Sequence, residues 1–149
     1  MLKKSKLEKT LEKMMSPKGK SEFEEQVAVM DWANKLSKRY PFLSYLFHIP
    51  NGGYRDPITA SRLKRAGVKP NIPDLFLPFP RVVAKTIQPI LYYGLFIEMK
   101  KVGKKCGDGQ LKAHEFLRGQ GYRVDACEGA SSAKIAICNY LNLNYYDLK

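Results

Sequence analysis

Apolar positions recur at helical spacing near the start of the chain. Ser21 is a favoured helix N-cap residue, and apolar residues then follow every three or four positions. The pattern predicts a helix from Ser21 to about Ser37. Its expected core stripe consists of Phe23, Val27, Met30, Ala33 and Leu36.

Alternating and continuous apolar runs further along the chain predict strands between additional helices. Strands are expected at 43–48, 74–77, 92–100 and 122–127, and helices at 57–66, about 108–119 and 131–140. The second and third strands are expected to form a hairpin with a long loop. The passage from Glu98 through a helix to Cys127 implies a parallel crossover in a mixed sheet, so the fold class is α/β.

Three charged residues interrupt the apolar strand pattern. Glu98 and Lys100 are two residues apart on one strand, so they share a face, and Asp74 opens another strand. Charged groups on an otherwise apolar strand are costly unless they pair, hold a metal or do chemistry. One interpretation is a Mg²⁺-dependent site for phosphodiester hydrolysis, in which Asp74, Glu98 and the Met99 carbonyl hold the ion and Lys100 orients water. The other is a buried ion pair between Lys100 and one carboxylate.

The charge balance points to a polyanionic partner. The chain has 149 residues, with 26 Lys plus Arg against 14 Asp plus Glu and a net charge of +12. This favours nucleic acid ahead of an acidic membrane. A single domain is expected over 21–149, after a basic arm or frayed helix over 1–20.

No apolar run is long enough to span a bilayer, and the first residues continue in charges rather than into a signal core. We therefore expect no membrane association, no secretion and a cytoplasmic location. Cys106, Cys127 and Cys138 are odd in number and lack CxxC spacing, which favours free thiols over disulfides or a zinc site.

Several motifs together resemble the PD-(D/E)xK nucleases, and most closely the VRR-NUC (virus-type replication-repair nuclease) family, over about 21–133. The resemblance rests on Ile49-Pro50-Asn51-Gly52-Gly53, Leu63-Lys64-Arg65-Ala66-Gly67-Val68, Ile72-Pro73-Asp74-Leu75-Phe76-Leu77-Pro78, Gly94-Leu95-Phe96-Ile97-Glu98-Met99-Lys100, Gln110 and Gly121-Tyr122-Arg123-Val124. It implies a restriction-endonuclease-like core of order αβββαβ, with a mixed sheet flanked by helices.

The resemblance also implies two further site residues. Glu22 matches an acidic metal ligand on the first helix, and Gln110 matches a glutamine that helps Lys100 position water; a helix-capping amide is the alternative for Gln110. At 100° per residue, Glu22 lies roughly 70° from the centre of the expected stripe, against roughly 130° for Glu25. Glu25 nevertheless stays open as the first-helix acid. His114 shares the apolar stripe of its helix and is expected to be packed rather than catalytic.

The chain departs from the family pattern at two places. Asn71 stands where a glycine is common, and asparagine also tolerates a left-handed backbone. The family's Ser-x-x-Gln reads Gly107-Asp108-Gly109-Gln110, so Asp108 is expected to replace the serine cap.

Candidate DNA contacts flank the carboxylates on two loops. They are His48, Asn51, Tyr54, Arg55, Lys101, Lys104 and Lys105. The histidine suits proton transfer or a phosphate contact, and the lysines suit salt-sensitive backbone contacts. The alternatives are a structural histidine, a turn-forming asparagine and solvated lysines.

The resemblance implies a Mg²⁺- or Mn²⁺-dependent DNA endonuclease without a small-molecule cofactor. Its stand-alone members imply a homodimer that cuts branched DNA, such as four-way (Holliday) junctions, in DNA repair or a phage setting, which for a viral protein means the host cytoplasm. A non-catalytic nucleic-acid-binding module with a degenerate site is a second hypothesis. A metal-dependent phosphatase of small phosphate esters is a third.

Overall fold

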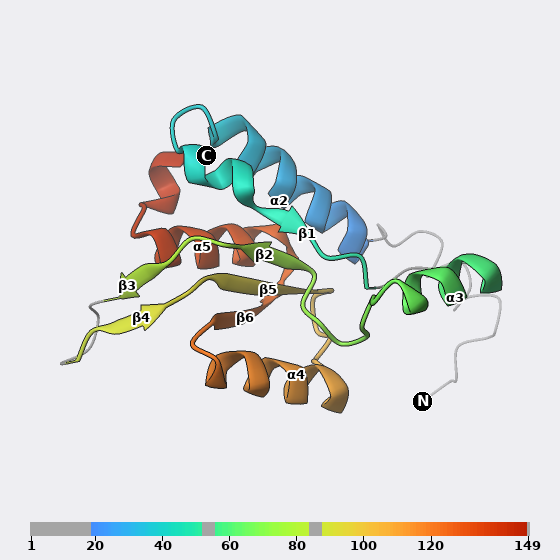
Figure 1. Ribbon diagram of the computed structural model, residues 1–149. Helices are drawn as coiled ribbons and strands as arrows, with labels where there is room; N and C mark the ends of the chain where they lie inside the picture. Colours follow the sequence, from blue (N-terminus) through green and yellow to red (C-terminus); the bar gives the residue numbers. More distant parts are fainter. Residues whose placement is uncertain (1–18, 52–55, 84–87, 149) are drawn as a thin grey trace, which may run out of the picture.

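The computed structural model describes residues 19–51, 56–83 and 88–148 (Figure 1). Its helices are α2 (Glu22–Leu36), α3 (Pro57–Arg65), α4 (Asp108–Gly119) and α5 (Gly129–Leu141), with 3₁₀ turns η1 (Pro41–Tyr45) and η2 (Tyr145–Leu148). Its strands are β1 (Phe47–His48), β2 (Leu75–Leu77), β3 (Arg81–Val83), β4 (Ile90–Tyr92), β5 (Leu95–Lys100) and β6 (Arg123–Glu128). The expected arm over 1–20 lies almost wholly outside the described residues.

The main sheet is mixed, as predicted. Its strand order is β1-β2-β5-β6, with β2 antiparallel to β5 and β6 parallel to β5. Helix α4 makes the crossover and covers one face, while α2 and α5 cover the other (Figure 1). The α/β class and the arrangement of a mixed sheet flanked by helices are confirmed.

The side chains of β5 alternate between these two faces. Ile97 and Met99 join the buried core with Val29 and Ile137 from the covering helices. Phe96 faces the other way and stacks on Phe76 of β2, with ring centroids 4.2 Å apart. Glu98 and Lys100 share the face of Phe96, so the strand directs its charged groups toward α4.

Helix α2 begins as predicted but turns a different face to the core. Ser21 forms a capping box with Glu24, the Glu24 amide donating to the serine hydroxyl at 3.2 Å. Phe23 and Val27 are 72% and 39% exposed, so placing them in the core was wrong. The buried face runs through Val29 and Trp32, whose indole nitrogen donates to the Leu148 carbonyl at 3.0 Å. This contact with the chain's other end sets the helix about a quarter turn from the expected stripe.

The segment predicted as a strand over 43–48 is mostly a 3₁₀ turn. Only Phe47 and His48 form a strand, after η1. Leu43 and Leu46 are both buried, and a 3₁₀ turn places residues three apart on one side. An extended strand would have sent them to opposite faces.

The long strand predicted over 92–100 is broken before β5. A side chain on Gly94 would come within 2.7 Å of the Phe76 ring and 2.9 Å of the Leu77 carbonyl oxygen. The backbone bends at this close approach, and the preceding residues pair with β3 as a separate two-stranded hairpin.

Helix α3 has the predicted ends. Asp56 caps it by accepting from the Thr59 amide at 3.0 Å, and Gly67 follows it with φ of +99°. None of the described helices is both long and apolar enough to cross a membrane. Cys106 is half-buried and Cys127 and Cys138 are buried, all as free thiols.

Candidate active site

The two predicted carboxylates meet across neighbouring strands. Leu75 pairs with Ile97 in the antiparallel ladder, so the next position places Asp74 opposite Glu98 on the α4 side of the sheet. The Asp74 Oδ2 atom accepts from the Met99 amide at 2.8 Å. Glu98 is only 2% exposed. Strand pairing therefore brings together two acidic groups that are distant in sequence.

Lys100 reaches back to the same carboxylate. Its Nζ lies 2.8 Å from Glu98 Oε1, so the ion pair that the sequence left open is present. Burial lowers the pKa of Lys100, but the hydrogen bond and charge of Glu98 outweigh it and hold that pKa above its ordinary value. Lys100 consequently remains a cation beside the carboxylates at neutral pH.

The two carboxylates resist ionising together. Burial, and then the charge of Glu98, raises the pKa of Asp74 to about 6, against the opposing hydrogen bond from Met99. Burial also raises the pKa of Glu98, opposed by Lys100 and reinforced by the charge of Glu22. A buried and a partly buried carboxylate with raised pKa values lie close together, and a divalent cation would offset the repulsion between their charges.

Helix α4 places one side chain near each carboxylate oxygen of Glu98. Gln110 Nε2 donates to Oε1 at 2.5 Å, while its own Oε1 accepts from the Gly107 amide at 3.1 Å. Gln110 thus caps the helix and contacts the carboxylate at once, which unites the two interpretations. One turn later, His114 Nε2 lies 3.5 Å from Glu98 Oε2.

His114 is packed, as expected, but its contact with Glu98 was not foreseen. It is 1% exposed, and neither its Nε2 nor Glu98 Oε2 has a hydrogen-bond partner among the described residues. Burial, followed by the charges of Arg118 and Lys100, lowers the pKa of His114, so the ring is neutral. The i, i+4 spacing from Gln110 was the signal in the sequence that could have indicated this contact.

Glu22 and Glu25 of α2 contact different parts of the chain. Glu22 accepts from the Lys101 amide at 3.0 Å, directly after β5. Glu25 accepts from the Ala130 amide at 2.7 Å, at the start of α5. Relative to the observed core face, both lie within roughly 30° of its centre, so the expectation that Glu25 points away was wrong. The contacts place Glu22, rather than Glu25, beside the carboxylate pair.

The donor atoms fit a hard divalent cation. The described residues hold no group of three or more His, Cys, Asp and Glu side chains placed to bind a metal. Mg²⁺, however, keeps several waters and takes few protein oxygens. Asp74 and Glu98 offer carboxylate oxygens, and Glu98 Oε2 is buried without a hydrogen-bond partner among those residues. The Met99 carbonyl points to the same strand edge as its amide, which contacts Asp74.

The two segments that depart from the family pattern contact each other at Asn71 and Gly109. Asn71 has φ of 67°, which confirms the left-handed backbone. Gly107 is the N-cap of α4, so the expectation that Asp108 supplies the cap was wrong. A side chain on Gly109 would come within 2.6 Å of the Asn71 amide nitrogen. Glycine at 109 therefore makes room for the larger residue at 71.

The residues predicted to contact DNA differ in their exposure and in their hydrogen bonds. His48 is exposed, and its Nδ1 lies 2.9 Å from the Asp74 carbonyl oxygen. The Asn51 side chain donates to the Ile72 carbonyl, which gives it a structural role in the loop. The lysines of the loop between β5 and α4 are exposed. They are Lys101, Lys104 and Lys105. Tyr54 and Arg55 lie outside the described residues.

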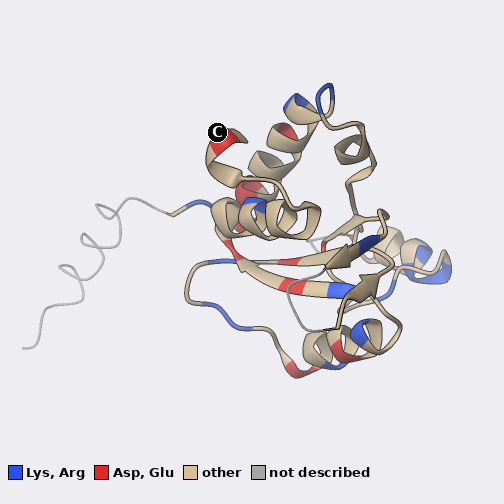
Figure 2. Ribbon diagram, turned by 90° about the vertical axis from the view of Figure 1, so that its left-hand side faces the viewer, with Lys and Arg blue, Asp and Glu red and all other residues tan. Residues whose placement is uncertain are grey.

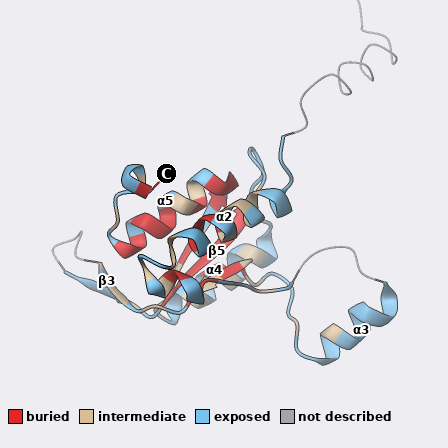
Figure 3. Ribbon diagram, turned by 90° about the horizontal axis from the view of Figure 1, so that it is seen from above, coloured by how far each residue is buried: buried red, intermediate tan, exposed pale blue. Residues whose placement is uncertain are grey.

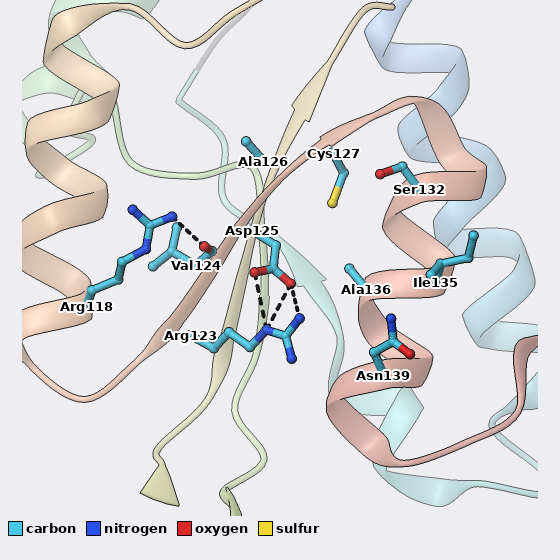
Figure 4. A pocket seen from close by; sticks show the side chains of 10 residues that line it. All are labelled: Arg118, Arg123, Val124, Asp125, Ala126, Cys127, Ser132, Ile135, Ala136 and Asn139. Atoms are coloured by element: carbon cyan, nitrogen blue, oxygen red, sulfur yellow. Dashed lines mark hydrogen bonds and ion pairs between the residues drawn. The ribbon is translucent and has the colours of Figure 1, made fainter. Parts of the chain in front are cut away.

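A groove of about 340 Å³ lies elsewhere, along the outer edge of β6. Arg118, Asp125, Ser132 and Asn139 are among the residues that line it (Figure 4). Asp74, Glu98, Lys100, Gln110 and His114 are not among its lining residues. At the carboxylate cluster, Asp74 and Lys100 are partly exposed and Glu98 is buried.

The mixed sheet and the Asp74, Glu98 and Lys100 cluster define a nuclease core of the PD-(D/E)xK type. The chain belongs to the VRR-NUC family, whose domain model matches residues 20–131. It is also similar to a solved VRR_NUC domain protein at 30% sequence identity, covering 86% of this chain and 93% of that one with a TM-score of 0.65. None of the curated proteins compared with the chain matches it. Family membership gives the chain a nuclease-type function, with DNA as the implied substrate.

Proposed function

We propose that the protein is a metal-dependent endonuclease that hydrolyses phosphodiester bonds in DNA. The observation that carries this proposal is the position of Asp74 opposite Glu98, one residue beyond the Leu75–Ile97 pair of β2 and β5, in a setting that raises the pKa of both. Glu22, Asp74, Glu98 and the Met99 carbonyl would hold Mg²⁺ or Mn²⁺. When bound, the ion supplies a more acidic water and neutralises charge on the phosphate.

The protein groups around the ion orient the reacting water. Lys100 keeps its proton, so its ammonium group acts as a donor that orients the water and the phosphate oxygen. Gln110 holds Glu98 in place through one oxygen. Water attacks phosphorus, the bond to the leaving oxygen breaks, and the products are a phosphate monoester and an alcohol. Lys101, Lys104, Lys105 and the exposed His48 lie where they could contact neighbouring phosphates.

The substrate is proposed to be branched DNA, such as a four-way junction, cut by a homodimer. Support comes from the resemblance to small stand-alone VRR-NUC nucleases and from the net charge of +12. A symmetric dimer presents two equivalent sites to two strands. The domain over 21–149, the basic arm and the cytoplasmic location are part of the same proposal.

The deciding experiment compares a labelled four-way junction, a matched duplex and single strands in Mg²⁺, Mn²⁺ or EDTA. Junction cleavage in either metal and none in EDTA is expected, and Asp74→Ala should bind without cutting. Metal-independent binding without any cleavage by the wild type would support the non-catalytic module instead. Turnover of a chromogenic phosphate ester but not of DNA would support the phosphatase. Sedimentation tests the dimer.

A further inference from the structure

Helix α3 stands apart from the body of the domain. It has nine residues, and none of them is buried. Figures 1 and 3 both show it projecting beyond the sheet, and the colouring of Figure 3 shows exposed residues along most of its length. A helix of this length is marginal in water by itself, because isolated helices need about 12–15 residues even when rich in alanine. The capping interactions at its ends therefore stabilise a helix that buries almost no side chain against the rest of the domain.

The exposed surface of α3 is basic. Arg62, Lys64 and Arg65 occupy its last turn, and Lys69 follows shortly after the helix. Figure 2 colours the Lys and Arg residues of the described chain blue. All four are exposed, and none forms an ion pair within the described parts of the chain. Cations in the last turn of a helix interact favourably with the helix dipole and stabilise the helix. That effect does not account for Lys69, which lies beyond the end of the helix.

The chain connects helix α3 to the carboxylate cluster on both sides. The segment after α3 runs directly into Asp74, and the segment before it follows His48. The Asn51 side chain donates to the Ile72 carbonyl and so joins the two connections. Helix α3 lies beyond the end of the sheet at which β5 terminates with Lys100 (Figure 1). A polymer bound at the carboxylates that extends in this direction passes α3.

We propose that α3 and Lys69 form an arm that binds the phosphate backbone of duplex DNA next to the cleavage point. This rests on the proposed function, because it takes DNA as the substrate. Charge favours DNA as the occupant, because the exposed cations of α3 form no ion pair among the described residues and a phosphate backbone supplies the complementary charge. Side chains that contact phosphate position a duplex without reading its sequence.

The test measures DNA affinity as a function of salt in EDTA, on an Asp74→Ala background that cannot cut. The arm variant replaces Arg62, Lys64 and Arg65 by glutamine. The control replaces Lys35, Lys38 and Arg39 by glutamine and removes the same charge; these residues are exposed and lie in the last turn of α2 and just after it. The slope of log affinity against log salt should fall by about 2 to 3 for the arm variant, with at least about a tenfold loss of affinity at moderate salt. The control should change affinity less than about threefold.

Equal losses in the arm variant and the control would overturn the arm, because only overall charge would then matter. Unchanged DNA affinity together with a smaller sedimenting mass for the arm variant would assign α3 to a second copy and also overturn it. If the Asp74→Ala parent binds no DNA, the arm and the proposed function fail together. If the parent binds and the wild type cuts while the arm variant matches the control, only the arm fails. The residues substituted in the arm variant and in the control are all exposed, so both should keep the melting temperature of the Asp74→Ala parent.

Discussion

The two faces of β5 carry opposite chemistry within a strand of six residues. On one face, Leu95, Ile97 and Met99 pack against α2 and α5 in the main core. On the other, Phe96 packs on aromatic rings, and Glu98 and Lys100 form a buried ion pair under α4. The first face buries only apolar side chains. The second face buries charged groups, which are costly unless they have compensating partners. The strand shows how period-two alternation lets one element serve both stability and chemistry.

The largest expected effect comes from Glu98→Gln compared with Met99→Leu. The first removes a carboxylate and should lower DNA cleavage by at least about a thousandfold, an effect of the size expected when a group that stabilises the transition state is lost. The second alters a side chain on the core face and keeps the backbone carbonyl, so cleavage should stay within about threefold. Single-turnover rates on a labelled junction measure both. Comparable losses in the two variants would remove the distinction between the faces.

His114 tests whether the α4 side positions Glu98. His114→Leu leaves Glu98 Oε2 facing an apolar group, and we expect about a tenfold weaker Mn²⁺ affinity, as for outer partners of metal ligands. His114→Gln retains a donor and should recover part of that affinity. Electron paramagnetic resonance of free Mn²⁺ measures binding independently of cleavage. Identical affinities in the two variants would mean that the histidine acts through packing alone.

The pKa of Asp74 predicts a pH-dependent cost in the metal-free protein. Its folded pKa of about 6 exceeds the ordinary value of 3.8, so the folded state holds the proton more tightly than the unfolded chain. Ionisation therefore destabilises the fold as pH rises from about 4 through 6. Asp74→Asn avoids this cost, so its melting temperature relative to the wild type should increase across that window. Scanning calorimetry in EDTA measures the difference, and a constant difference with pH would contradict the prediction.

The smallest effect concerns the contact between Asn71 and Gly109. Gly109→Ala should lower the melting temperature by a few degrees, because the new methyl group meets the Asn71 side chain. Asn71→Gly in the same chain should restore it, and alanine should then help the helix by about 0.5–1 kcal/mol. Thermal melts of the four combinations form a double-mutant cycle with a coupling of about 1 kcal/mol. Additive effects would show that the two positions are independent.

Sequence patterns predicted the parts of this molecule that depend on local rules. The capping of α2 by Ser21, the left-handed Asn71 and the common face of Glu98 and Lys100 each follow from a few adjacent residues. The parallel crossover followed from the general handedness and length of such connections. These features hold wherever the segment is placed, so the sequence by itself determined them.

Tertiary structure decided the features that depend on contacts between distant segments. The hydrogen bond from Trp32 to the Leu148 carbonyl helps to set which face of α2 packs on the core. Glu25 therefore lies near that face, where it contacts Ala130, and not on the opposite side as the sequence pattern predicted. The bend at Gly94 exists because Phe76 and Leu77 of another strand approach its backbone. Glu98 gained His114 as a neighbour only because α4 packs on that face of the sheet. Helix periodicity fixes relative angles along one helix, but only packing against the rest of the chain selects which angle faces inward.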